Sequence, residues 1–139
     1  MHAYIYSDIT LGMAHSKTYV LSQDTYNSFL RTFGDTNPLH VDDNIAQANG
    51  FKKRIAHGAI LNGFLSQFVG MEFPGANSIL QSVTMRYHAP CYIGDILEFH
   101  AAVTQKVDAV CVIVMNIRII NKTQNCPSAA ATVQMGMLA

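Results

Sequence analysis

Residues 33–40 read Phe-Gly-Asp-Thr-Asn-Pro-Leu-His and contain the two side-chain types that acid–base chemistry uses most often. Asp35 and His40 are five positions apart, whereas neighbours on one face of a helix are about three or four apart. Pro38 disfavours the α region for Asn37, whose side chain can hydrogen-bond local backbone, so we predict a fixed turn. Such a turn can bring the carboxylate and the imidazole to one water, an arrangement for general acid–base catalysis. Gly-Asp and Asn-Pro are also common in ordinary solvated turns, so the octapeptide alone leaves both interpretations open.

A second chemically informative segment begins at His57-Gly58. Apolar residues at positions 60, 61, 64, 65, 68 and 69 recur with helical spacing and predict a largely buried helix from 58 to 70. Its start has no side-chain cap beyond the glycine, so the amide of Gly58 is free to attract negative charge. The segment therefore predicts an oxyanion-binding site at Gly58. The alternative is that Gly58 only permits close packing.

The elements before this helix position the Asp35 loop. Residues 17–21 are typical of a short strand, and Ser22 can cap a helix that ends at Gly34. The apolar face of that helix is formed by Tyr26, Phe29, Leu30 and Phe33. Residues 42–48 predict one more short helical turn, which ends at Asn49-Gly50.

The rest of the chain is predicted to be an antiparallel sheet. After a break at Pro74-Gly75, four runs typical of strands follow near 78–89, 95–107, 110–122 and 128–138. In the second run, Leu97, Phe99, Ala101 and Val103 alternate with more polar residues, which indicates a half-buried strand. One buried helix needs a concave sheet around it. The expected fold class is therefore α+β, a single hotdog domain over residues 1–139, in which a bent antiparallel sheet wraps a central buried helix.

Composition restricts the partners. The chain has 139 residues, half of them hydrophobic, and only 13% are charged, compared with about a quarter in ordinary globular proteins. So little charge predicts that part of the surface is covered by another subunit, giving a homodimer or a higher homo-oligomer. A formal net charge of zero argues against nucleic acid or an anionic membrane as partner.

Cysteine and histidine spacing predict neither disulfides nor a metal. Cys91, Cys111 and Cys126 form no Cys-x-x-Cys pair, and Cys111 is expected in the core of an apolar strand. The histidines show no metal-ligand spacing. The first residues lack the build of a signal peptide, and the longest apolar run, 109–115, is too short to span a bilayer. A reducing cytoplasm is the expected location.

Taken together, these segments resemble a known family. Residues 33–40 and the run Ile-Ala-His-Gly-Ala-Ile at 55–60 are similar to the hydratase 2 signature of the MaoC-like (R)-specific enoyl-CoA hydratases, which have the hotdog fold. Residues 79–95 also resemble a strand of that family and its proline-to-Gly-Asp turn. The resemblance extends from about residue 15 to the end of the chain.

The resemblance implies reversible syn addition of water to a trans-2-enoyl-CoA, a step of fatty acid metabolism that needs no cofactor besides the coenzyme A thioester substrate. Asp35 is then the expected general base, and His40 holds the same water. The amide of Gly58 meets the negative charge that develops on the thioester oxygen. Family hotdog domains usually pair edge to edge, with the acyl pocket at the dimer interface.

Three further residues are expected to position these groups. Ser66 matches a family serine that orients the signature loop, although a serine within an apolar helix can instead bond the carbonyl four residues back. Asn37 is expected to position the loop, and His57 to pack behind the site. The basic run 52–54 can be a solvated loop or can lie near the phosphates of coenzyme A.

Other functions remain open at this point. A 3-hydroxyacyl-[acyl carrier protein] dehydratase performs the same chemistry in reverse. A hotdog acyl-CoA thioesterase usually carries its acid on the central helix, and residues 58–70 contain no Asp or Glu. A non-catalytic acyl-thioester-binding partner subunit would keep the fold and lose Asp35 or His40, and both are present.

Overall fold

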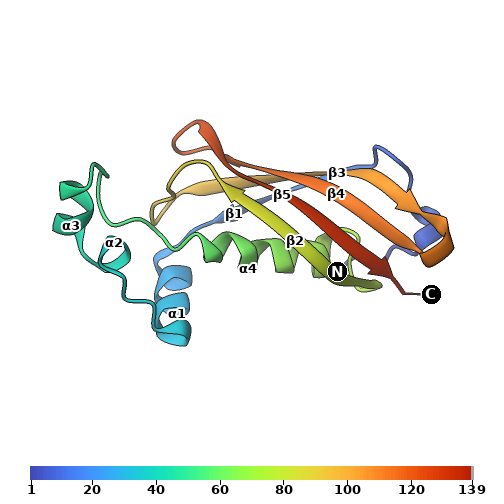
Figure 1. Cartoon of the computed structure of the whole chain (residues 1–139), viewed down its shortest axis with the longest axis horizontal. Coiled ribbons are helices and arrows are strands. Elements are labelled where there is room, and N and C mark those ends of the chain that lie inside the picture. The colour runs from blue at the N-terminus through green and yellow to red at the C-terminus, as the bar shows by residue number, and fades with distance from the viewer. Residues whose placement is uncertain (139) are drawn as a thin grey trace.

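The computed structural model describes residues 1–138, which fold around a five-stranded antiparallel sheet with the strand order β1-β3-β4-β5-β2. The strands are β1 (Ala14–Val20), β2 (Ser78–Tyr87), β3 (Ile96–Val107), β4 (Val112–Asn121) and β5 (Cys126–Met137). They lie close to the predicted runs. Helix α4 (Ala59–Gln67) runs along one face of the curved sheet (Figure 1). The predicted α+β hotdog architecture is confirmed.

The core lies between α4 and this face of the sheet. The inward residues Leu97, Phe99, Ala101 and Val103 of β3 are buried, as their alternation predicts. They meet the buried helix residues Leu61, Leu65 and Phe68 in one apolar cluster. The α-helix ends at Gln67, three residues before the predicted end, and continues as the wider turn η2 (Phe68–Glu72). The apolar pattern could not show where the α-helix ends, because Phe68 and Val69 in η2 are apolar and buried like the helix residues before them.

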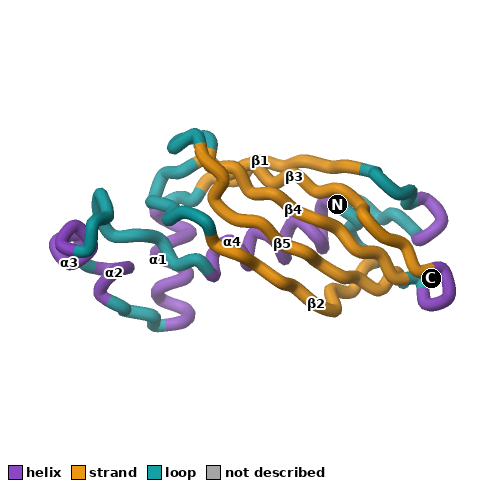
Figure 2. The backbone as a smooth tube through the Cα atoms, turned by 45° about the horizontal axis from the view of Figure 1, so that its top comes forward, coloured by secondary structure: helices purple, strands orange, loops and turns teal. Residues whose placement is uncertain are grey.

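The helices before α4 gather at one end of the sheet (Figures 1 and 2). Helix α1 (Gln23–Phe33) begins as predicted, with the Ser22 hydroxyl accepting from the Thr25 amide at 3.1 Å, and ends at Gly34 with φ 67°. The short helices α2 (Pro38–Val41) and α3 (Asp43–Ala48) follow, the second of them as predicted. Two further short turns, η1 (Tyr6–Asp8) and η3 (Asp108–Val110), lie outside this group.

The prediction that Cys111 lies in the core of an apolar strand is wrong. It lies in the turn between η3 and β4, with φ 51°, and is only partly buried. Strand β4 begins one residue later, at Val112. The apolar run 109–115 gave no sign of this turn, because hydrophobicity by itself carries no information about backbone direction.

The turn between β2 and β3 is held by the buried carboxylate of Asp95. This carboxylate accepts from the Tyr92 amide at 2.9 Å, from Asn121 Nδ2 at 2.6 Å and from Gln124 Nε2 at 2.7 Å. Three donors satisfy this buried carboxylate and hold the turn in place. The turn fixes residues 87–91, which form a wall of the site described below. No helix among residues 1–138 is long and apolar enough to cross a membrane.

Candidate active site

The loop that carries Asp35 differs from the predicted turn in one respect. Residues 34–37 form a loop, but Pro38 begins one turn of helix, α2, which contains His40. The Asn37 side chain caps this helix by accepting from the Leu39 amide at 3.0 Å. Asn37 therefore positions the loop, as predicted, and does so as a helix N-cap with proline at the first helical position.

Asp35 is held by one hydrogen bond to its side chain from within the loop and by one contact of its backbone carbonyl with His57. Its Oδ1 accepts from the amide of Asn37 at 3.2 Å, and its carbonyl oxygen lies 2.8 Å from His57 Nε2. The side chain is exposed, so water can reach the carboxylate.

The hydrogen bonds of His40 assign its tautomer. Nδ1 lies 2.9 Å from the carbonyl oxygen of Ile55. A carbonyl only accepts, so Nδ1 carries the proton and Nε2 of the neutral ring is left as an acceptor. The backbone carbonyl of His40 in turn accepts from the Tyr26 hydroxyl at 2.6 Å. The imidazole is thereby held, and its Nε2 has no hydrogen-bond partner in the described part of the chain.

His57 lies behind these two residues, as the sequence predicts. It is 2% exposed, and its ring centroid is 4.1 Å from that of His40 and 4.8 Å from that of Phe29. Its contact with the Asp35 carbonyl requires Nε2 to be the donor, which leaves Nδ1 as an acceptor. Within residues 1–138, this Nδ1 has no hydrogen-bond partner. His57 therefore ties the start of α4 to the Asp35 loop.

The structure brings Asp35, His40 and His57 together. One oxygen or nitrogen donor atom of each lies within 4.8 Å of the others. The proximity of Asp35 and His40 that the octapeptide suggested is present in the fold. Their catalytic roles stay predictions.

Gly58 begins α4 without a side-chain cap, as predicted. The first bonds of the helix are donated by the amides of Ile60 and Leu61, at 3.1 and 3.0 Å. The amides of Gly58 and Ala59 donate to no group in the part of the chain that the structure describes. A Cβ on Gly58 would lie 3.1 Å from a ring carbon of Tyr87, so this glycine also permits a close contact. The close-packing interpretation of Gly58 is therefore supported by this contact, and its oxyanion role stays a prediction.

A cavity of about 330 Å³ opens beside this cluster. His40, His57 and Gly58 form one side of it, and residues 87–91 form another. Phe51, Ile55, Ala56 and Leu61 complete a mainly apolar lining. Such a lining with a few convergent polar groups is typical of a small-molecule site.

Ser66 is not brought to this site. It lies eight residues beyond Gly58, about 12 Å along the helix axis. Its side chain is exposed and makes no hydrogen bond to any of residues 1–138, so the structure contains neither the contact with the signature loop nor the bond to the carbonyl four residues back. The positioning role predicted for Ser66 has no support within this chain.

Sequence reasoning missed Tyr87 and Asn62. The Tyr87 hydroxyl donates to Asn62 Oδ1, and the Tyr87 ring covers Gly58. Asn62 is four residues after Gly58 on the same helix face, so a polar residue at this position was a usable signal. Tyr87 lies at the end of strand β2, far from Gly58 in the sequence, and no local pattern pointed to it.

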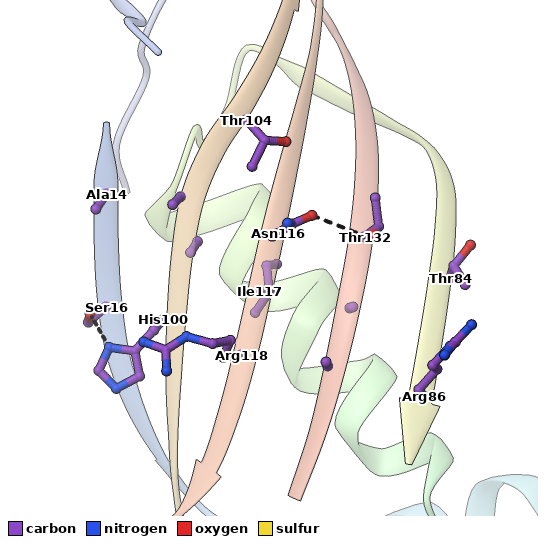
Figure 3. Close-up of a pocket in the computed structure, with 14 residues that line it drawn as sticks. Ala14, Ser16, Thr84, Arg86, His100, Thr104, Asn116, Ile117, Arg118 and Thr132 are labelled. Atoms are coloured by element: carbon purple, nitrogen blue, oxygen red, sulfur yellow. Dashed lines mark hydrogen bonds between the residues drawn. The ribbon is translucent and has the colours of Figure 1, made fainter. Parts of the chain in front are cut away.

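A larger depression, of about 550 Å³, lies on the opposite face of the sheet (Figure 3). Ser16 and His100 form a hydrogen bond at one side, and Asn116 and Thr132 form another near the middle. In Figure 3 the side chain of Arg118 points toward His100, whereas Arg86 points toward the outer edge of β2. The two cationic groups diverge, so no common ligand position is formed there.

Comparison with known proteins agrees with this geometry. Residues 8–125 match the model of the MaoC like domain. The chain is 35% identical over 99 residues to an (R)-specific enoyl-CoA hydratase of Rhodospirillum rubrum, covering 71% of this chain and 69% of that protein. It is 30% identical over 102 residues to a 3-hydroxybutyryl-CoA dehydratase of Methylorubrum extorquens, covering 73% of this chain and 65% of that protein.

Among solved structures, the R-hydratase PhaJ1 from Pseudomonas aeruginosa superposes with a TM-score of 0.86 and 25% identity, over 96% of this chain and 85% of that one. The (R)-hydratase of A. caviae shares the fold, with a TM-score of 0.84 and 21% identity over 93% of this chain and 97% of that one. The family model covers most of the chain, and the fold and the Asp35–His40 loop are those expected from the signature. The chain therefore belongs to the MaoC-like dehydratase family.

Proposed function

We propose that this protein is an (R)-specific enoyl-CoA hydratase, acting in reverse as a 3-hydroxyacyl thioester dehydratase. The observation that carries the proposal is the pairing of Asp35 with a His40 ring whose Nε2 has no hydrogen-bond partner among residues 1–138, beside the uncapped amide of Gly58. The hydratase and dehydratase named among the relatives support the same chemistry.

In the proposed reaction, one water lies between the Asp35 carboxylate and His40 Nε2. Both groups are acceptors, so they bind the two hydrogens of the water and leave an oxygen lone pair free to attack Cβ. As the C–O bond forms, one proton passes to this pair and the electrons of the C=C bond move toward the thioester carbonyl. The pair then returns a proton to Cα on the same face, which makes the addition syn.

The charge on the thioester oxygen needs a donor. The amides of Gly58 and Ala59 lack partners in the described chain and lie at the positive end of α4. We assign the oxyanion role to Gly58, because it lines the cavity beside His40. Losing one such donor commonly costs about 100- to 1,000-fold in rate.

Coenzyme A is the proposed carrier of the acyl group. Lys52 and Lys53 line a depression of about 470 Å³ that also includes Thr123 and Gln124. Phe51, the residue before this basic pair, lines the cavity at His40. A phosphate-bearing carrier whose thioester reaches His40 can therefore place its phosphates near these lysines.

We further propose that the working unit is a homodimer. Strand β2 forms one edge of the sheet, so its outer backbone groups have no strand partner within residues 1–138. Ile79, Leu80 and Tyr87 on this strand are exposed apolar side chains, and Tyr87 also lines the cavity. A second copy at this edge would cover them and bring another chain next to the cavity.

The proposed activity is tested by following loss of enoyl thioester absorbance with crotonyl-CoA and longer trans-2-enoyl-CoAs, and with the same acyl groups on acyl carrier protein. Chiral analysis should find the (R)-3-hydroxyacyl product. Faster turnover on carrier protein would reassign the carrier. Release of free coenzyme A without hydroxyacyl product would identify a thioesterase and overturn the proposal, and binding without turnover would point to a non-catalytic partner subunit.

A further inference from the structure

A second group of metal-ligating side chains lies at the other end of α4, far from the Asp35 loop. The amino-terminal segment lies beside this end of the helix (Figure 1). It places His2 next to His15 of β1 and Glu72 of η2. One donor atom of each residue lies within 4.8 Å of the other two.

The backbone of His2 is anchored even though its side chain is exposed. Its amide donates to the Met71 carbonyl at 2.9 Å, and its carbonyl accepts from the Ala76 amide at 2.9 Å. This carbonyl approaches Gly75 so closely that a Cβ there would lie 2.0 Å from it, and Gly75 has φ +93°. His2 is therefore held beside η2, and its exposed imidazole stacks on the Tyr4 ring at a centroid distance of 6.0 Å.

His15 is held more firmly. Its ring stacks on Phe73 with a centroid distance of 5.6 Å and an interplanar angle of 18°. The ring of His2 meets it edge-on at a centroid distance of 5.6 Å. Two imidazoles from separate segments thus face a common point.

Glu72 supplies a carboxylate to the same point. It forms an ion pair with Lys17, and Gln67 Nε2 donates to it at 3.4 Å. The Lys17 ammonium is thus already a cationic partner of this carboxylate. A metal ion would have to share this carboxylate with the Lys17 ammonium.

We propose that His2, His15 and Glu72 bind a divalent transition metal ion, with zinc as the best-matched ion. Two imidazoles and one carboxylate are ligands that zinc accepts, with water in the fourth position. Donors of a tetrahedral zinc site are about 3.4 Å apart, given bond lengths near 2.1 Å. The three ligand atoms now lie within 4.8 Å of one another, so binding must bring them closer, and the exposed His2 side chain is the one best placed to move. The bound ion would clamp the amino-terminal segment to β1 and η2.

The cluster at Asp35 is the competing candidate for the same ion. His57 Nε2 and His40 Nδ1 face backbone carbonyls, which leaves His57 Nδ1 and His40 Nε2 as the possible metal ligands there. At His2 and His15, the structure shows no side-chain hydrogen bond from either ring among residues 1–138. Zinc binding that depends on His2 but not on His40 therefore distinguishes the two clusters.

The experiment uses untagged protein freed of metal by a chelator and titrated with zinc in competition with a chromophoric indicator. One ion per chain is expected, and Co²⁺ should give the visible absorption of a tetrahedral site. His2→Gln and His15→Gln should each weaken zinc binding by about tenfold or more, because even outer-sphere changes cost about 10- to 100-fold. Lys17→Met should tighten it, because the competing cation is gone.

Two control variants complete the design. His100→Gln removes a histidine that pairs with Glu98 on the sheet surface, and His40→Gln removes one from the Asp35 cluster. Neither should change zinc affinity. His2 is exposed, so its variant keeps the fold even if His15→Gln does not. Absence of binding, equal affinity in His2→Gln and the parent protein, or loss of binding in His40→Gln would overturn the proposal.

Discussion

At the scale of single residues, the free Nε2 of His40 is what makes the Asp35–His40 pair chemically useful. His40 Nδ1 donates to the Ile55 carbonyl, and the Tyr26 hydroxyl donates to the backbone carbonyl of His40. The ring can therefore exchange a proton with a water without losing its own support. Asp35 is exposed and can share that water.

Asp35→Asn should lower kcat by about 100-fold or more, because the base is removed while the size of the side chain is kept. The asparagine Oδ1 can still accept from the Asn37 amide, so the melting temperature should change little. His40→Gln should lower kcat by a similar factor. The double variant should be little slower than the slower single variant, since residues that act as a unit are not additive. Steady-state kinetics with crotonyl-CoA check this, and near-normal kcat in Asp35→Asn would remove Asp35 from the mechanism.

At the scale of elements, two glycines can be compared: Gly58 at the N-cap of α4 and Gly63 within the helix. A Cβ on Gly58 would press on the Tyr87 ring at the cavity, whereas a Cβ on Gly63 meets nothing within 4 Å. Alanine keeps the amide, but its Cβ would press on Tyr87 and displace that amide. Gly58→Ala should therefore lower kcat more than it raises KM, since the oxyanion contact strengthens in the transition state. Gly63→Ala should leave kcat near the parent value and stabilise the fold by about 0.5–1 kcal/mol, because alanine favours a helix interior. Kinetics and urea unfolding of the two variants check both. Equal kcat in both would contradict the role of Gly58.

The tie between η2 and β1 should show in the pH dependence of stability. Lys17 lowers the pKa of Glu72 below its ordinary value of 4.5, so the folded state holds the carboxylate ionised more strongly than the unfolded chain does. The resulting stabilisation is present above the unfolded pKa and is lost as pH falls through the lower folded pKa. The parent protein should therefore melt above Glu72→Gln near neutral pH, and the gap should close in acid. Melting curves from pH 7 down to pH 3 in metal-free buffer check this, and a gap independent of pH would contradict it.

At the scale of the whole molecule, the proposed homodimer can be tested at the edge strand β2. Its exposed Ile79 is 54% accessible, whereas Val110 is 64% accessible and lies in η3, which connects the inner strands β3 and β4. Ile79→Glu should weaken dimerisation, because it places a charge in the proposed contact. Val110→Glu, a comparable change, should leave the dimer intact. Sedimentation at micromolar concentration checks this. A fully active monomeric parent protein would defeat the dimer proposal.

Local features of the sequence predicted much of this molecule. Ser22 and Gly34 mark the ends of α1, and the alternation in β3 identifies its buried face. Asp35 and His40 could be paired because they are close along the chain, so a short loop alone restricts their separation. Each of these predictions depends on interactions within a few residues, which a sequence pattern records directly.

The tertiary structure alone decided the rest. The bond from His57 to the Asp35 carbonyl, the cover of Tyr87 over Gly58, and the meeting of His2, His15 and Glu72 all join segments far apart in sequence. Such contacts depend on how the sheet curves around α4, which no local pattern encodes. The same reason explains why Cys111 was assigned to the core. Spacing along the chain determined which residues could do chemistry, and the packing of distant segments determined which of them meet.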